Sequence, residues 1–187
     1  RLWKRFTIDC SGVRPGHQVL DLAGGTGDIT ALFSKRVGPT GKVILADINE
    51  SMLNVGRDKL RDLGLVNNID YVQANAEALP FADNSFDAVT MSFGLRNVVE
   101  PKKALAELYR VTKPGGRIVI CEFSTPPAAP IRAGYNFYLR KVMPMVAKYS
   151  SSNTEAYTYL ADSIEDWPNQ ATLATWIREA GFMNVAY

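Results

Sequence analysis

Short apolar runs alternate with amphipathic stretches along most of the chain. Runs typical of buried strands occupy residues 19–23, 42–47, 70–74, 86–91 and 117–122. Apolar residues recur at helical spacing over 28–37, 51–63, 101–111 and 166–180. Strands that alternate with helices need crossover connections, which produce a parallel sheet. The pattern therefore predicts an α/β fold with a doubly wound, mostly parallel sheet.

The two ends of the chain suggest a second expectation. Residues 1–6 have the pattern of a helix interior without an initial Met, and the chain ends at Tyr187 in a predicted strand that starts at Phe182. We therefore expect a single domain over 1–187 that is a fragment truncated at both ends. Within it, 125–165 is expected to form an insertion on the substrate side, acting as a lid.

Composition limits the functions that the chain can have. Its 187 residues carry 21 Lys and Arg against 19 Asp and Glu, a net charge of +2, without the dense basic stripe of a nucleic-acid binder. No apolar run reaches the roughly 18 residues that span a bilayer. Cys10, Cys121 and a single His cannot build a structural zinc site, so no metal is expected. The two separate thiols suit a reducing cytoplasm.

The first predicted strand runs into a glycine-rich turn, Asp21-Leu-Ala-Gly-Gly-Thr-Gly-Asp28. In a doubly wound sheet this turn borders the ligand crevice, and glycines let the backbone approach a ligand closely. Gly25, Thr26 and Gly27 are therefore candidate cofactor contacts. Many proteins use such a turn only to pack a helix on a strand, so the turn alone does not decide its function.

Two cofactors compete for this turn, a dinucleotide and S-adenosylmethionine. The dinucleotide pattern G-x-G-x-x-G fails here, because Thr30 stands at the third glycine position. Asp28 also places a carboxylate at the helix N-terminus, where a pyrophosphate would otherwise bind. S-adenosylmethionine has no phosphate and carries an ammonium group, which Asp21 is placed to meet directly or through water. The turn therefore favours S-adenosylmethionine.

Polar residues also follow the next three strands. Asp47 ends the second strand, twenty residues after Gly27, where a carboxylate can accept hydrogen bonds from both ribose hydroxyls. Asn75 and Ala76 follow the third strand, where an amide and a backbone N–H can bind the adenine edge. Ser92 ends the fourth strand. Each could have a purely structural role, which for Asp47 would be that of a helix N-cap or a turn residue.

Taken together, these segments resemble the class I S-adenosylmethionine-dependent methyltransferases, which have a Rossmann-like fold. More narrowly, they resemble the C-methyltransferases of ubiquinone and menaquinone biosynthesis. Besides the glycine-rich turn, the resemblance rests on Ala46-Asp-Ile-Asn-Glu-Ser-Met-Leu53, Asn75-Ala-Glu-Ala-Leu-Pro-Phe81, Ser92-Phe-Gly-Leu-Arg-Asn-Val98 and Lys113-Pro-Gly-Gly116. It implies a last antiparallel strand beyond Tyr187, and cofactor contacts at Thr26, Asp47, Asn75, Ala76 and Ser92.

The implied reaction transfers a methyl group to a ring carbon of a polyprenylated quinol. Such a carbon becomes nucleophilic when an adjacent hydroxyl loses its proton, so a cation near that oxygen is expected. Arg96 and Asn97, in the loop after the fourth strand, are the candidate catalytic residues. Arg96 cannot be an ordinary base, since its pKa exceeds about 12. The alternative for Arg96 is an ion pair that anchors its loop.

The stretch Ile131–Tyr149 is rich in aromatic residues and Met, with basic residues between them. It is either an ordinary packed helix that Pro144 interrupts or an apolar wall for a polyprenyl tail that rests on a membrane surface. The second reading adds peripheral contact with the inner membrane face as an expectation. A quinone-biosynthesis complex and a homodimer are further expected partners. The rival functions are an NAD-dependent oxidoreductase and a non-catalytic component that binds S-adenosylmethionine.

Overall fold

The computed structural model describes residues 2–138, 159–160, 162–164 and 166–187. The chain divides into two compact units, Arg1–Glu122 and Phe123–Tyr187. The elements of the first unit are α1 (Leu2–Ser11), β1 (Gln18–Leu22), α2 (Asp28–Val37), β2 (Lys42–Asp47), α3 (Glu50–Asp62), β3 (Ile69–Gln73), β4 (Phe86–Ser92), η1 (Leu95–Asn97), α4 (Pro101–Val111) and β5 (Thr112–Cys121). Those described in the second include α5 (Ala129–Phe137) and α8 (Gln170–Glu179).

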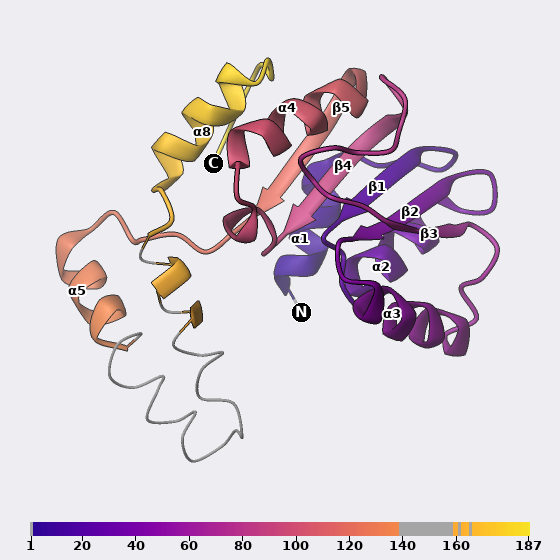
Figure 1. The fold of residues 1–187 in the computed structure, drawn as a ribbon, viewed down its shortest axis with the longest axis horizontal. Coiled ribbons are helices and arrows are strands. Elements are labelled where there is room, and N and C mark those ends of the chain that lie inside the picture. The colour runs from indigo at the N-terminus through magenta and orange to yellow at the C-terminus, as the bar shows by residue number, and fades with distance from the viewer. Residues whose placement is uncertain (1, 139–158, 161, 165) are drawn as a thin grey trace. The chain divides into compact units, whose positions relative to one another are not determined.

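The strands of the first unit form one parallel sheet in the order β3-β2-β1-β4-β5 (Figure 1). Leu20 of β1 is in register with Ile44 of β2 on one side and Val89 of β4 on the other. The chain moves outward from β1 in one direction and, after β3, returns to build the other half. The strand order therefore reverses between β1 and β4, and their carboxyl ends border the expected ligand crevice.

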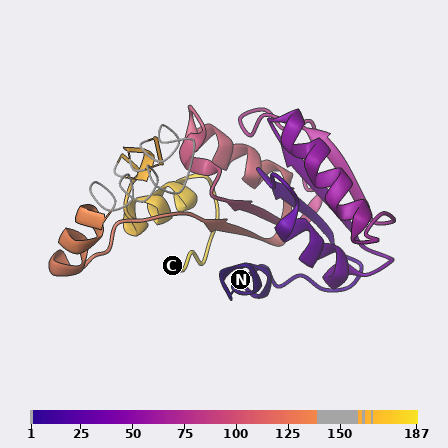
Figure 2. The same cartoon turned by 90° about the horizontal axis from the view of Figure 1, so that it is seen from below.

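Apolar side chains cover both faces of this sheet. Val19, Val43 and Ala88 share one face and pack in a buried cluster with Ile8 of α1 and Phe33 of α2. A second cluster, on the same face because Leu45 follows Val43 by two residues, joins β2 and β3 to α3. Since crossovers are right-handed, the return path puts α4 on the opposite face, and α1 and α4 lie on opposite sides of the strands (Figure 2). The doubly wound α/β prediction is confirmed.

Two predicted element boundaries differ in the structure. The predicted helix over 166–180 begins only at Gln170, because Pro168 precedes the cap residue Asn169, whose Oδ1 accepts from the Thr172 backbone N–H at 2.9 Å. The predicted strand from Phe182 is wrong. The chain there has no strand pairing, and Asn184 has a φ of 57°, which breaks an extended run.

The sequence predicts a turn over 113–116, but the structure places this segment within β5. Phe86 pairs with Thr112, but Ala88 pairs with Arg117, so β5 has extra residues opposite a single residue of β4. Gly115 takes a φ of 80°, which a bulge of this kind needs. The pairing is regular from Arg117 to Cys121, so the bulge leaves the site end of β5 in normal register.

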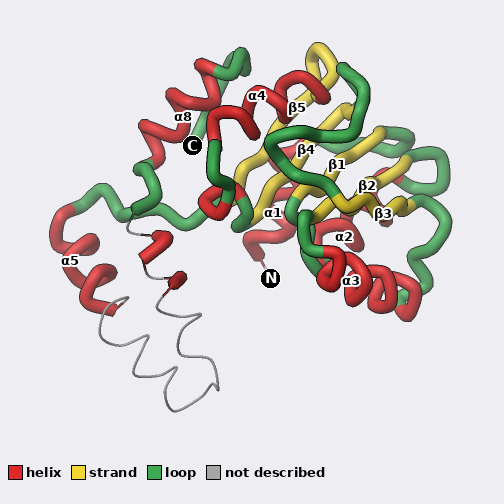
Figure 3. Tube along the Cα trace, in the orientation of Figure 1, coloured by secondary structure: helices red, strands yellow, loops and turns green. Residues whose placement is uncertain are grey.

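The second unit has a small core of its own. Ile164 is buried and packs with Phe123, Tyr135 and Leu160, while the rings of Trp167 and Trp176 meet edge to face at 6.2 Å. Figure 3 shows where the described helices of this unit occur along the trace. Residues 139–158, with Pro144 and most of the predicted aromatic wall, lie outside the described residues. The single-domain and lid predictions therefore stay predictions. Among the described helices, none has the length and apolar character to cross a bilayer.

Candidate cofactor and acceptor site

The glycine-rich turn joins β1 to α2 at the carboxyl edge of the sheet. A Cβ on Gly24 would lie 2.3 Å from Leu45 Cδ1, and one on Gly27 would lie 2.7 Å from Leu60 Cδ1. Gly27 also has a φ of 76°. These two positions require glycine for packing against β2 and α3. Gly25 has a φ of 55°, which glycine adopts without steric cost, and its lack of a side chain lets a ligand approach the backbone where the turn borders the expected crevice.

Asp47 links this turn to the end of β2. Its Oδ2 accepts from the Gly25 backbone N–H and its Oδ1 from the Asn49 N–H, both at 2.9 Å. The side chain is thereby fixed, although each oxygen keeps a second lone pair that can accept a further hydrogen bond. Helix capping falls to Asn49, whose Oδ1 accepts from the Met52 N–H, so Asp47 is not a helix cap. Its bond from the Asn49 N–H is a turn contact, so the alternative of a turn Asp describes a real interaction.

Asp21 is buried beneath the turn. Its Oδ2 accepts from the Thr30 hydroxyl at 2.6 Å and its Oδ1 from the Thr90 hydroxyl at 2.9 Å. Burial raises the pKa of Asp21 to about 6, and the nearby Asp47 adds to that increase. Since both oxygens are already hydrogen-bonded, Asp21 holds α2 and β4 against the turn. Its predicted contact with an ammonium group stays a prediction.

Asp28 does not present a bare carboxylate at the N-terminus of α2. Its two oxygens pair with Lys4 and Lys59, each at 2.5 Å. The hydrogen bonds from Lys4, and then from Lys59, hold the pKa of Asp28 below its usual value. The two lysines offset the negative charge of Asp28, so this carboxylate repels a pyrophosphate less than the sequence indicated.

Asn75 and Ala76 follow β3 at the same edge. The Ala74 N–H donates to the Asp47 carbonyl at 3.0 Å, which holds this segment against the end of β2. The side chain of Asn75 accepts from the Glu77 N–H at 2.9 Å, whereas Ala76 is buried. The structure therefore brings the segment next to Asp47, but the side chain of Asn75 takes part in a local turn.

Ser92 ends β4, and its hydroxyl is buried without a hydrogen-bond partner. A buried hydroxyl of this kind normally has a partner, so this one is available to a ligand. Directly after it, Phe93 has a φ of 57° and turns the chain toward the glycine-rich turn. A Cβ on Gly94 would lie only 2.4 Å from the Cβ of Ala23, which shows how closely the two loops approach.

Arg96 and Asn97 lie in η1, after β4. Arg96 Nη1 forms a buried ion pair with Glu122 Oε2 at 2.8 Å and also donates to the Phe93 carbonyl at 2.9 Å. Glu122 also accepts from the Arg96 backbone N–H at 3.3 Å. The alternative reading of Arg96, an ion pair that anchors the loop, therefore describes a real contact. Asn97 is exposed, and its amide reaches the Phe93 carbonyl at 3.5 Å.

Sequence reasoning missed Glu122 as well as Thr30 and Thr90. Glu122 ends a predicted apolar strand, the same signal that identified Asp47, so it could have been found. Thr90 is 69 residues from Asp21, and only the strand register brings the two together. Within the described residues, no group of three or more His, Cys, Asp or Glu is placed to hold a metal ion.

The residues at this edge fit S-adenosylmethionine. Asp47 is fixed with lone pairs to spare for a sugar diol. Ser92 offers a buried hydroxyl without a partner, and Gly25, which donates its N–H to Asp47, has no side chain to block a ligand. The acids Asp21 and Asp47 lie beside the turn, and the nearby cations Arg96, Lys4 and Lys59 are paired with Glu122 and Asp28. Unpaired acids suit a sulfonium cation better than a diphosphate.

Comparison with known proteins identifies the family. The family model described as the ubiE/COQ5 methyltransferase family matches residues 1–187. The chain belongs to the ubiE/COQ5 methyltransferase family. Ubiquinone/menaquinone biosynthesis C-methyltransferase UbiE of Escherichia coli O1:K1 is 59% identical over 187 residues, which are 100% of this chain and 74% of that protein. The protein of the same name from Klebsiella pneumoniae has the same identity and coverage.

Solved structures agree with the fold of this ubiE/COQ5 family member. A SAM dependent methyltransferase from Aquifex aeolicus matches with a TM-score of 0.69 at 24% identity, over 95% of this chain and 78% of that one. Phosphoethanolamine N-methyltransferase 2 of Haemonchus contortus, solved with S-adenosyl-L-methionine, matches with a TM-score of 0.72 at 17% identity, over 98% and 37%. The chain is a methyltransferase whose cofactor is S-adenosylmethionine, and the NAD-dependent oxidoreductase alternative is discarded.

Proposed function

We propose that this methyltransferase transfers the methyl group of S-adenosylmethionine to a ring carbon of a polyprenylated quinol in ubiquinone or menaquinone biosynthesis. The observation that carries the proposal is the 59% identity, over the whole chain, to relatives named as C-methyltransferases of that biosynthesis. Two of the segments that carry the resemblance, 75–81 and 92–98, begin at the carboxyl edge of the sheet, at the ends of β3 and β4. They are therefore placed to determine what binds there.

On the cofactor side, each candidate residue has a separate task. The carboxylate of Asp47 binds the ribose diol, and the backbone of Gly25, Thr26 and Gly27 lines the crevice. Asn75 and the Ala76 backbone border the adenine ring, while the Ser92 hydroxyl contacts the cofactor from below. When bound, the cofactor supplies an electrophilic methyl group on a sulfonium. The main contribution of the protein is then to align donor and acceptor, an effect worth about 7–11 kcal/mol in well-oriented systems.

On the acceptor side, Arg96 and Glu122 act as a pair. Glu122 accepts the proton of the quinol hydroxyl and becomes neutral. The guanidinium of Arg96 is then no longer paired with a charged carboxylate and stabilises the phenolate oxygen. The activated ring carbon forms its new bond to the methyl group as the bond from sulfur to that methyl breaks. The ring carbon then loses its proton to water, and Glu122 returns its proton to the oxygen. Asn97 adds an amide donor.

Variants of this ion pair test the proposal. Removing Arg96 alone would leave Glu122 buried without its arginine, which endangers folding. The double variant Arg96→Gln with Glu122→Gln removes both charges, and Arg96→Lys keeps the charge but loses the planar fork. We expect the double variant to lower kcat by about 100-fold and to change the dissociation constant of S-adenosylhomocysteine by less than about twofold. An equal loss of both would show that the pair only holds the loop.

The acceptor itself is tested with labelled S-adenosylmethionine and demethyl forms of a benzoquinol and a naphthoquinol. Methylation of either supports the proposal. Cofactor binding without transfer to either acceptor would contradict it and favour the non-catalytic component. Because a polyprenyl acceptor resides in bilayers, we further propose peripheral contact with the inner membrane face from the cytoplasm. A quinone-biosynthesis complex and a homodimer complete the proposal.

A further inference from the structure

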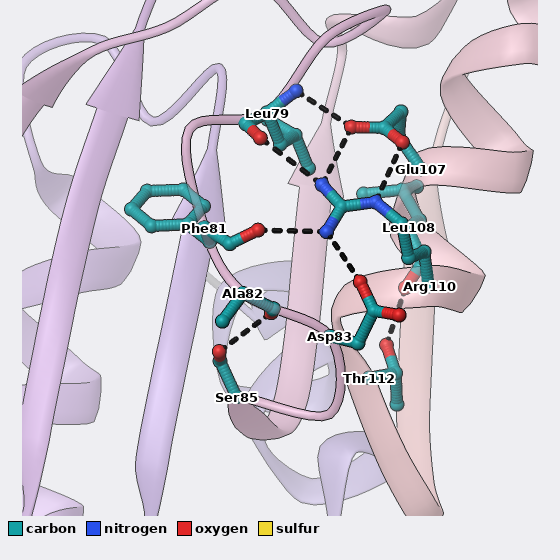
Figure 4. Close-up of polar contacts among 9 residues, drawn as sticks. All are labelled: Leu79, Phe81, Ala82, Asp83, Ser85, Glu107, Leu108, Arg110 and Thr112. Carbon is teal, nitrogen blue, oxygen red and sulfur yellow. Dashed lines mark hydrogen bonds and ion pairs between the residues drawn. The ribbon is translucent and has the colours of Figure 1, made fainter.

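We propose that an ion pair in α4, Glu107 with Arg110, is a positioning device for the cofactor-binding segment 75–81 (Figure 4). This inference rests on the assignment of Asn75 and Ala76 to the adenine side of the cofactor. The pair itself contacts neither of these residues. It acts on the backbone a few residues further along the chain, and its effect on the ligand is indirect.

The segment between β3 and β4 needs outside partners for its backbone. It contains no helix or strand, so its polar groups cannot be satisfied by regular secondary structure. Arg110 supplies several partners at once. Nη2 donates to the Leu79 carbonyl at 3.0 Å, and Nη1 donates to the Phe81 carbonyl at 2.7 Å and to Asp83 Oδ1 at 2.8 Å. One rigid fork thus fixes three points of the connection between β3 and β4, two of them in 75–81.

Glu107 completes the arrangement from one turn earlier in α4. Its Oε2 accepts from the Leu79 backbone N–H at 2.7 Å, so the ion pair satisfies both backbone groups of that residue. Its Oε1 accepts from Arg110 Nε at 2.7 Å and its Oε2 from Nη2 at 2.8 Å. The carboxylate therefore orients the guanidinium and holds the segment at the same time. Figure 4 shows both side chains reaching from the helix to the loop.

The other end of the segment is held at the site itself. The Ala74 N–H donates to the Asp47 carbonyl at 3.0 Å, and the Ala78 N–H donates to the Asn75 carbonyl at 3.1 Å. Ala76 therefore lies between an anchor on β2 and an anchor on α4. Leu79 is only three residues from Ala76. A displacement of the backbone at Leu79 therefore also moves Ala76, because the tight turn at Asn75 connects the two.

The helix does not depend on this ion pair for its own position. Four apolar residues on one face of the helix are 0% exposed and belong to the core: Ala104, Leu105, Leu108 and Val111. The side chain of Arg110 is 31% exposed. Loss of Arg110 should therefore leave the helix in place and release the segment. We expect this loss to lower the affinity for the cofactor more than it lowers the stability of the fold.

Three variants of the full chain test this role. Arg110→Met removes the fork, Arg110→Lys keeps the charge with a single donor group, and Arg61→Met is the matched control. Arg61 also forms an ion pair with a residue three positions earlier, Asp58, but it is 64% exposed on α3. We expect Arg110→Met to raise the dissociation constant of S-adenosylhomocysteine about tenfold, and Arg110→Lys about threefold. Arg61→Met should change it less than twofold.

The positioning role also predicts the kinetics. With saturating S-adenosylmethionine, Arg110→Met should keep kcat within about twofold while the KM for the cofactor rises as the dissociation constant does. A lower Tm with unchanged affinity would overturn the inference and leave a purely structural pair. A lower kcat with unchanged affinity would overturn it as well. Because affinity is measured without an acceptor, a wrong assignment of the quinol would not affect this test.

Discussion

At the scale of single residues, Asp21 has the most unusual environment of the described carboxylates. Burial raises its pKa to about 6 in the folded protein, whereas 3.8 is the ordinary value. The protonated form is therefore favoured by folding. Its contribution to stability is complete below pH 4 and is lost as the pH rises through 6, an effect of about 3 kcal/mol.

This predicts a specific difference between the wild type and Asp21→Asn. Between pH 4 and pH 6 the free energy of unfolding of the wild type should fall relative to that of the variant, which has no proton to lose. Urea unfolding at pH 4, 5, 6 and 7 measures it. The amide can still bond the hydroxyls of Thr30 and Thr90, so the variant should fold. Parallel pH profiles would show that Asp21 ionises at an ordinary pKa.

Asp21 also illustrates which parts of the site the sequence could predict. The turn and Asp47 were recognisable because their signals are local: glycines at fixed spacing and an acid at the end of an apolar run. The partners of Asp21 and the contact between Arg96 and Glu122 depend on strand register and loop approach, 69 and 26 residues apart in sequence. No local sequence pattern shows that residues so far apart in the chain are in contact.

At the scale of elements, α3 has a glycine where it passes the glycine-rich turn. A Cβ on Gly56 would lie 3.0 Å from the Gly25 carbonyl oxygen. A Cβ on Gly134 of α5 would meet no such neighbour within 4 Å. Alanine stabilises an exposed helix by about 1 kcal/mol relative to glycine. The same substitution should therefore have different consequences in the two helices.

Gly56→Ala should push the turn at Gly25 and raise the dissociation constant of S-adenosylhomocysteine about fivefold, with little gain in Tm. Gly134→Ala should raise the Tm and leave the affinity unchanged. Calorimetry and thermal unfolding of both variants provide the comparison. Equal affinities for the two variants would mean that the turn adapts to α3 without cost.

The agreement between predicted and observed boundaries differs from element to element. The helices at 28–37 and 101–111 and the strand at 42–47 have the predicted boundaries. Gly38 follows the first helix and Pro101 begins the second, so each helix has a local end signal beside its apolar periodicity. The strand expected from Phe182 does not form: residues 182–187 pair with no strand in the described part of the chain, and Asn184, with a φ of 57°, turns the backbone. An apolar run alone does not make a strand, because a strand also needs pairing and an extended backbone.

At the scale of the whole molecule, the candidate cofactor residues and the stretch 131–149 belong to different units. The candidate cofactor residues all belong to Arg1–Glu122, whose sheet was predictable from alternating patterns. Phe123–Tyr187 has few buried side chains among its described residues and exposes large apolar ones instead. Ile131 is 63% exposed and Phe137 64% exposed. Tyr135, from the same stretch, packs on Ile164 and has a structural role.

Exposed apolar side chains of this kind suit a long isoprenoid chain, because its burial is driven by area alone. Phe137→Ser should raise the KM for a long-tailed quinol about fivefold and leave the KM for a tail-less acceptor unchanged. The fivefold change corresponds to about 1 kcal/mol of binding free energy, lost with the apolar contact area.

Met183→Ser is the matched control, because Met183 is 86% exposed in the same unit but lies outside 131–149. The measurement is the ratio of KM values for the two acceptors. An equal rise for both would place Phe137 near the ring or in the fold, and a rise in the Met183 variant would mean that any exposed apolar group has the same effect. A change confined to the long tail would assign this surface to the lipid part of the substrate, and it would separate the residues that recognise the tail from those that methylate the ring.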